Sequence, residues 1–169
     1  MVDIFIIEEL GKDCDWGATS FYMYKEKGGK LYFTAPWDFD FCMGGYSSGI
    51  KITGLISAGT SGNEWFEELH NVRWFVEMVQ ARMNSLEDDI LDCLVMLRKY
   101  ALALEPYANQ SNDRWDVFGV NYHYFVSPQV ALLCSTYQEH IAFVHDWVLY
   151  RWQILREFYP ATGTSSLIK

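Results

Sequence analysis

The chain has 169 residues, of which half are hydrophobic and 17% are aromatic, and this composition excludes a disordered or fibrous protein. Its length is that of one domain and is enough to bury a sizeable core. With 13 basic and 22 acidic residues the formal charge is −9, so we expect neither nucleic acid nor an anionic membrane as a partner, because both bind positively charged surfaces.

The first ten residues have no basic segment, and acidic residues interrupt their apolar run, so we expect no signal peptide. No stretch approaches the roughly 18 apolar residues that a membrane span requires. The chain as it stands is therefore expected in the cytoplasm. The four cysteines are far apart and are expected to be reduced core thiols, with one disulfide as the alternative. They are Cys14, Cys42, Cys93 and Cys134.

The first part of the chain predicts a helix end followed by a hairpin. Residues 4–10 are typical of a helix, and Gly11 is placed to stop it. Two runs rich in β-forming residues, 20–25 and 30–35, flank a Gly-Gly turn and predict a β-hairpin. Pro36 should end the second strand because proline has no amide hydrogen to donate.

Residues 44–63 contain six glycines and predict a loop with a short strand at 50–52. A helix should start near Asn63, and Asn71 should separate it from the next helix and cap that one. The loop therefore divides the hairpin from a helical second half.

Apolar residues at steps of three and four predict a further helix that ends at Pro106, with a turn over 109–113. This stripe consists of Leu86, Ile90, Leu94, Leu97, Ala101 and Leu104. A last helix shows a similar stripe over 137–155. The fold class is therefore α+β, with a short hairpin followed by a helical bundle. We expect residues 1–159 to form the folded unit and residues 160–169 to form a flexible tail.

Four oxygen-bearing side chains flank the predicted hairpin. Asp15 and Ser20 precede its first strand, and Asp38 and Asp40 follow its second. A hairpin brings its flanking residues together, so these groups can converge at its open end and offer hard oxygen ligands for Mg²⁺ or Mn²⁺. The alternative is that Asp15 and Asp38 merely cap a turn and a loop.

The order of these residues is similar to that in the catalytic half of a protein kinase, where a loop aspartate, a metal-binding asparagine five residues later, a hairpin and a D-F-G aspartate follow one another. Asp15 stands at the first place, Ser20 at the second, and Asp38 or Asp40 at the third. One carboxylate would orient the acceptor hydroxyl, and the other would hold ions that neutralise phosphate charge.

These segments resemble the CotH (spore-coat protein H) kinase family of atypical, secretory-kinase-like proteins. The most specific element is the P-W-D-F-D sequence at 36–40, which follows the K-L-Y-F sequence at 30–33. Weaker similarity extends over roughly residues 3–159 and includes the segments 65–69, 75–82 and 112–115, and a last helix with Arg151.

The resemblance implies the C-terminal lobe of an atypical protein-kinase-like fold, which transfers phosphate from ATP to Ser/Thr of a protein substrate with Mg²⁺ or Mn²⁺. It implies Asp15 as the catalytic aspartate, Ser20 as a cofactor contact, and Asp38 and Asp40 as metal ligands. Which of these two is the main ligand stays open. Intact members of the family can be secreted or lie on the spore surface.

The sequence departs from the family pattern in two places. A serine, Ser20, stands where an asparagine is expected, and only about seven residues precede Glu8, where the lysine-bearing ATP lobe should lie. We therefore expect a truncated domain that lacks the N-terminal ATP lobe and has little kinase activity alone. An N-terminal lobe on a separate chain, or self-association, would cover an apolar face expected at Ile4, Phe5, Ile7 and the aromatic residues of the hairpin.

Two other functions stay open on the sequence. The first is a non-catalytic protein-interaction or structural module built from the hairpin and the helices. The second is a metal-dependent hydrolase that uses Asp15, Asp38 and Asp40.

Overall fold

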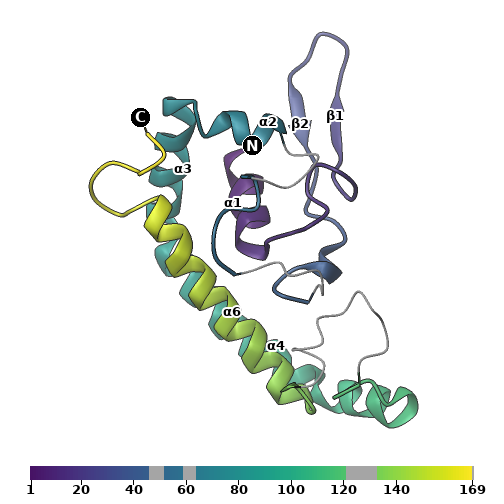
Figure 1. Ribbon diagram of the computed structural model, residues 1–169. Coiled ribbons are helices and arrows are strands. Elements are labelled where there is room, and N and C mark those ends of the chain that lie inside the picture. Colours follow the sequence, from purple (N-terminus) through teal and green to yellow (C-terminus); the bar gives the residue numbers. More distant parts are fainter. Residues whose placement is uncertain (46–51, 59–63, 121–132, 169) are drawn as a thin grey trace.

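The computed structural model describes residues 1–45, 52–58, 64–120 and 133–168. Within these residues the protein is mostly helical, with one two-stranded antiparallel sheet, in agreement with the α+β class predicted from the sequence. Helix α1 (Val2–Gly11) contacts both α3 (Arg73–Ser85) and α6 (Tyr137–Phe158), and the hairpin projects to one side (Figure 1).

Helix α1 supplies much of the core. It ends at Gly11 as expected, and Lys12 then takes a left-handed conformation with φ of 53° while its amide donates to the carbonyl oxygen of Glu8. The prediction of an exposed apolar face is wrong for Ile4 and Phe5, which are 8% and 0% exposed, and holds for Ile7 at 41%. The helix turns Ile4 and Phe5 toward α3 and α6 because burying them there removes large apolar surfaces from water.

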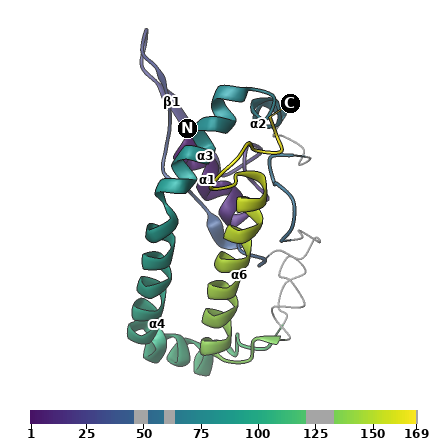
Figure 2. The ribbon, with the colours of Figure 1, turned by 90° about the vertical axis from the view of Figure 1, so that its left-hand side faces the viewer.

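The predicted hairpin is confirmed as β1 (Met23–Lys25) and β2 (Leu31–Phe33). Tyr24 lies opposite Tyr32, and their rings stack with centroids 5.1 Å apart. The strands stand away from the helices (Figure 2), and β2 ends before Pro36. Most of the strand predicted at 50–52 lies outside the described residues.

The base of the hairpin is anchored to the core by aromatic rings. Phe21 lies 5.6 Å from Phe33 across the hairpin and 5.6 Å from Phe66 of the short helix α2 (Glu64–Leu69), measured between ring centroids. Phe66 is fully buried. The residues that flank the two strands are therefore held at the edge of the core while the tip of the hairpin is exposed.

Helix α4 (Glu87–Trp115) corrects two predictions. It continues through Pro106, and the expected turn at 109–113 is helical. An internal proline removes one amide donor and bends a helix without always ending it, and Figure 1 shows the C-terminal part of α4 turning away from the line of α6. Helix α3 is capped by Val72, without a side-chain hydrogen bond, instead of by Asn71.

Helices α4 and α6 run side by side in opposite directions (Figure 2). Helix α6 starts with a capping box in which the Thr136 hydroxyl accepts the amide of Glu139 and the Glu139 carboxylate accepts the amide of Thr136. The predicted apolar stripe of α6 is confirmed by the buried side chains of Val148, Trp152 and Leu155.

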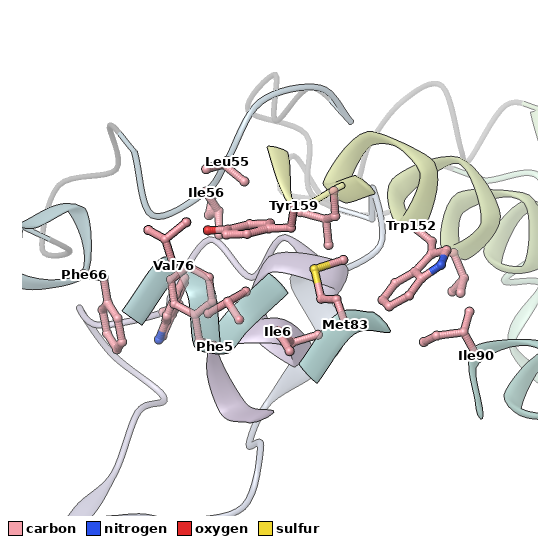
Figure 3. Close-up of a cluster of buried hydrophobic side chains, with 14 of the residues drawn as sticks. Phe5, Ile6, Leu55, Ile56, Phe66, Val76, Met83, Ile90, Trp152 and Tyr159 are labelled. Atoms are coloured by element: carbon pink, nitrogen blue, oxygen red, sulfur yellow. The ribbon is translucent and has the colours of Figure 1, made fainter. Parts of the chain in front are cut away.

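One continuous core joins α1, α3, α4, α6 and the segment 52–58. Figure 3 shows Phe5, Val76 and Tyr159 in its middle, and Trp152 beside Ile90 at the end formed by α4 and α6. Phe5 makes edge-on contacts with Trp16 and Phe75, with ring centroids 5.4 and 5.1 Å apart. Rings from distant parts of the chain thus converge on α1.

The C-terminal segment, expected to be a flexible tail, contacts helix α3 in the structure. The Gln80 amide donates to the carbonyl oxygens of Pro160 and Gly163, at 2.7 and 2.9 Å, and Ser165 is buried. Leu167 and Ile168 pack against the core. These contacts extend the folded unit beyond residue 159.

All four cysteines are free, as expected. Cys42 and Cys134 are buried core thiols, whereas Cys14 is partly buried and Cys93 is exposed, so the core assignment is wrong for Cys93. Among the described helices, none combines the length and apolar character needed to cross a membrane.

Candidate functional site

The structure brings together two of the residues predicted to form a site. The Ser20 hydroxyl donates a hydrogen bond to Oδ2 of Asp38, 3.3 Å away, across the base of the hairpin. Ser20 precedes β1 and Asp38 follows β2, so strand pairing delivers both side chains to one place. The Asp38 side chain makes no capping bond to the 3₁₀ helix η1 (Phe39–Phe41) that it precedes, although a loop cap was the alternative role for this residue.

The backbone around this pair is strained. Ser20 and Asp38 have φ angles of 47° and 64°, and Lys12 and Met43 nearby in the chain have φ of 53°. Non-glycine residues rarely adopt this left-handed region, and such conformations persist at functional sites where the surroundings enforce them. Four of the five such residues found in the described part of the chain lie within residues 12–43.

Asp15 and Asp40 lie on the two segments that meet at this site. Asp15 is partly buried, and its carbonyl oxygen accepts the amides of Ala18 and Thr19, both at 3.0 Å, which closes the loop before Ser20. Asp40 belongs to η1 and is exposed. No hydrogen bond or ion pair of the Asp40 side chain is found within the described residues, so its carboxylate is open to solvent.

Asp38 and Asp40 are the carboxylates that a divalent cation could use at this site. In the described residues no three His, Cys, Asp or Glu side chains come together as a metal-binding group, so the predicted convergence of Asp15, Asp38 and Asp40 on one cation is not found. Mg²⁺ commonly uses one or two carboxylates and takes its other ligands from water and substrate phosphates. Asp38 supplies one such carboxylate, and Asp40 follows it by two residues.

A buried acidic cluster lies behind the exposed pair. Glu8 and Asp13 are 2% and 1% exposed, and their carboxyl groups are hydrogen-bonded to each other. Burial, together with the negative charge of Asp13, raises the pKa of Glu8 to about 8, and burial also raises the pKa of Asp13. Glu8 is therefore protonated at neutral pH.

Two thiols border this acidic cluster. The Cys42 side chain is hydrogen-bonded to Asp13, and burial followed by the charges of Asp13 and Glu8 raises the pKa of Cys42. Burial, with the charge of Asp15, raises the pKa of Cys14 to about 12. Both groups are therefore neutral thiols and poor nucleophiles, which argues against cysteine catalysis at this site.

A second buried network links α1 to α6. The Arg151 guanidinium donates to Oε2 of Glu9 at 2.8 Å and to the carbonyl oxygen of Glu9 at 2.7 Å, and both side chains are almost fully buried. It also donates to the carbonyl oxygens of Ile52 and Gly54. The charge pair thus fixes the segment 52–57 against both helices.

The same network includes Ser57 and His70. Glu9 accepts the amides of Ile56 and Ser57, both at 2.9 Å, and the Ser57 hydroxyl donates to the Glu9 carboxylate and contacts Nε2 of His70 at 3.0 Å. Ser57 is fully buried, and burial lowers the pKa of His70. No substrate can reach this serine, so the serine–histidine contact is part of the scaffold.

Comparison with known protein families finds a match. The family model described as CotH kinase protein matches residues 1–155. The chain belongs to the CotH kinase family. No curated protein and no solved structure matches the chain. The CotH match spans α1, the Asp15 loop, the hairpin, η1 and nearly all of α6, so the candidate site lies wholly within it.

Sequence reasoning missed the buried polar groups of this CotH-family chain. Glu9, Ser57 and His70 were not expected to meet, because they come from three segments that only the tertiary fold brings together. The available signal was the consecutive pair Glu8-Glu9 in the segment 4–10, whose other residues are all apolar, because a helix that is apolar on all sides is buried.

Proposed function

We propose that this CotH-family chain provides the metal- and phosphate-binding half of an atypical protein kinase, with a fold like that of a kinase C-terminal lobe. The reaction would transfer phosphate from ATP to Ser/Thr hydroxyls of a protein substrate. The observation that carries this proposal is the hydrogen bond between Ser20 and Asp38, which joins the two segments that kinase chemistry needs side by side.

Each residue of the site has a distinct role in this proposal. Asp15 orients the acceptor hydroxyl and accepts its proton, and Asp38 and Asp40 hold the cation. Ser20 contributes a hydroxyl and fixes the Asp38 carboxylate. When bound, Mg²⁺ or Mn²⁺ neutralises the charge of the phosphates. The left-handed backbone at Ser20 and Asp38 supports a functional role, because such conformations persist where the surrounding structure enforces them.

A second lobe would complete the nucleotide site. Positioning and charge neutralisation provide almost all of the catalysis in phosphoryl transfer, so we propose that the chain alone has little kinase activity. A hollow of about 570 Å³ between α1 and β2, with Ile7, Leu31 and Tyr32 in its walls, offers an apolar surface next to the site. A partner lobe or a second copy would bind there.

The test measures the melting temperature with MnCl₂ and ATP, each alone and together. Together, at about 100 times the dissociation constant, they should raise the melting temperature by about 5–10 °C. The gain should disappear in Asp38→Asn and persist in Asp92→Asn, which removes an exposed charge on α4. A gain that survives in Asp38→Asn would contradict the assigned metal ligand.

A radiolabelled-phosphate assay separates the remaining outcomes. Rapid phosphorylation by the isolated chain that is lost in Asp38→Ala would support the kinase and overturn the need for a second lobe. Stabilisation by metal alone, with phosphatase turnover, would favour the metal-dependent hydrolase.

A non-catalytic interaction module is the alternative that one observation favours. Helix α4 exposes several large apolar side chains, including Val95 at 67%, Leu102 at 73% and Tyr107 at 69%. Such side chains on one helix are typical of a surface that binds another protein. No stabilisation by Mn²⁺ with ATP, together with a concentration-dependent dimer in sedimentation experiments, would support this alternative.

A further inference from the structure

The Asp13 carboxyl group lies at the junction of three segments. It is 1% exposed, and its Oδ1 accepts the amide of Asp15 at 3.0 Å. It is also hydrogen-bonded to the carboxyl of Glu8 on α1 and to the thiol of Cys42, which directly follows η1. Asp13 thus connects the core helix with both segments that carry the candidate site.

The partners of Asp13 are donors without positive charge. The ion pairs found among the described residues include neither Asp13 nor Glu8, and the neighbouring Lys12 ammonium donates to the carbonyl oxygen of Thr53. A buried carboxylate without a cation must be stabilised by hydrogen-bond donors. The Glu8 carboxyl can be such a donor only while it holds its proton.

The surroundings of Glu8 indicate that Glu8, and not Asp13, carries the proton between the two carboxyl groups. Its Oε2 is buried and has no hydrogen-bond partner within the described residues. An unpartnered buried oxygen costs much less on a neutral carboxyl group than on a charged carboxylate. The titratable groups that act on Glu8 are Asp13 and Glu9, both acidic, and those that act on Asp13 besides Glu8 are Asp15 and Cys42.

The contacts of Asp13 set the position of both halves of the site. The Asp15 loop begins at the amide that Asp13 accepts, and the segment after η1 is tied back by the Cys42 thiol and by the amide of Met43, which donates to the carbonyl oxygen of Gly11 at 2.7 Å. Movement of the Asp13 carboxylate would therefore shift Asp15 relative to Asp38.

We propose that Asp13 is a positioning residue of the candidate kinase site, and that a proton held on Glu8 keeps its carboxylate in place between the Asp15 loop and the segment that follows η1. This role rests on the proposed function, because it assigns Asp13 to the site through Asp15 and Asp38. Loss of the Glu8 proton places two carboxylates side by side in the core, and their repulsion loosens the Asp15 loop.

The ionisation of Glu8 sets the pH at which this change should occur. Burial and the charge of Asp13 raise the pKa of Glu8 to about 8, so the loop is held at pH 6 and released at pH 9. The amides of Ala18 and Thr19 report the state of the loop, since both donate to the carbonyl oxygen of Asp15.

The experiment measures hydrogen exchange of these two amides by NMR at pH 6 to 9, with rates corrected for the intrinsic pH dependence of exchange. In the wild-type chain, protection should fall by about tenfold across this range, the factor for a lost buried hydrogen bond. In Glu8→Gln the side-chain amide can donate to Asp13 at every pH, so the protection of the Ala18 and Thr19 amides should stay constant. Asp13→Ala should lack protection throughout, whereas Asp13→Asn retains an acceptor for the Asp15 amide and should recover most of it.

Wild-type pH dependence that persists in Glu8→Gln, or protection within about twofold of wild type in Asp13→Ala, would overturn the proposal. If Asp13→Ala does not fold, Glu8→Gln alone decides. Asp92→Ala on α4 is the matched control and should behave as wild type. The hydrogen-exchange experiment is done without any ligand. If Mn²⁺ and ATP fail to bind, that result counts against the proposed function, whereas the contact between Asp13 and the Asp15 loop is tested by exchange alone.

Discussion

Glu8 and Glu9 are neighbours on α1 and are both almost fully buried, yet the protein stabilises their carboxyl groups in opposite ways. Glu9 pairs with the Arg151 guanidinium and also accepts the backbone amides of Ile56 and Ser57. Glu8 meets another acid, Asp13, and is neutral because it keeps its proton. The Glu9 region is a fixed scaffold, whereas the Glu8 region changes with pH and lies directly behind the candidate site.

The largest effect is expected from breaking the charge pair of the Glu9 region. Arg151→Met removes the cation that is hydrogen-bonded to the buried Glu9 carboxylate, which should lower the free energy of unfolding by about 3–5 kcal/mol. Urea denaturation followed by circular dichroism measures this loss. The double variant Glu9→Gln/Arg151→Met should recover a large part of it. If Arg151→Met costs less than 1 kcal/mol, the scaffold role of this region is wrong.

A smaller loss is expected where the segment after η1 touches α6. A Cβ atom on Gly44 would lie 2.7 Å from Cζ3 of Trp147, and the residue has φ of 80°. Gly44→Ala should therefore cost about 1–3 kcal/mol through overpacking, in addition to the cost of backbone strain. Gly54→Ala is the matched control, because its φ is 71° and a Cβ atom there would meet nothing within 4 Å. Equal losses in thermal denaturation would exclude a tight contact with Trp147.

The Glu8 region should reveal itself in the pH dependence of stability. The folded chain holds a proton on Glu8 up to about pH 8, whereas the unfolded chain releases it near pH 4.5. The stabilisation from Glu8 is therefore complete below pH 4.5, is lost as pH rises to about 8, and changes no further above that. The difference in free energy of unfolding between wild type and Glu8→Gln should follow this course.

Burial lowers the pKa of His70, so the contribution of His70 makes the folded chain more stable as the pH rises toward its ordinary value of 6.5, opposite to the effect of Glu8. This contribution is the same in wild type and Glu8→Gln, so it cancels when the free energies of unfolding of the two proteins are subtracted at each pH. A difference that stays constant from pH 4.5 to 8 would show that Glu8 is ionised in the folded chain.

The smallest effect on stability is expected at the exposed pair. Ser20→Ala removes a solvent-exposed hydrogen bond and should change the free energy of unfolding by less than about 0.5 kcal/mol. Ser57→Ala removes a fully buried hydroxyl that contacts Glu9 and His70 and should cost about 1–3 kcal/mol. Chemical denaturation of the two variants compares the exposed site with the buried scaffold. A larger loss of unfolding free energy for Ser20→Ala than for Ser57→Ala would show that Ser20, and not Ser57, belongs to the stabilising scaffold.

The hairpin and the pairing of Ser20 with Asp38 could be predicted because both depend on local rules. A Gly-Gly turn between two β-rich runs fixes the strand register, and the register brings the flanking residues together. The end of α4 was missed because a proline inside a helix can bend it as well as end it, and the packing of α4 on α6 favours continuation.

The sequence by itself determined the α+β class, the hairpin, most helices, the order of candidate site residues and the CotH resemblance, because these depend on short-range spacing and on motifs. Only the tertiary structure decided that Glu9 meets Arg151, that Ser57 meets His70, and that Glu8 meets Asp13. The electrostatic state of a buried acid depends on donors and charges from distant segments, and no local pattern encodes which of these the fold places beside it.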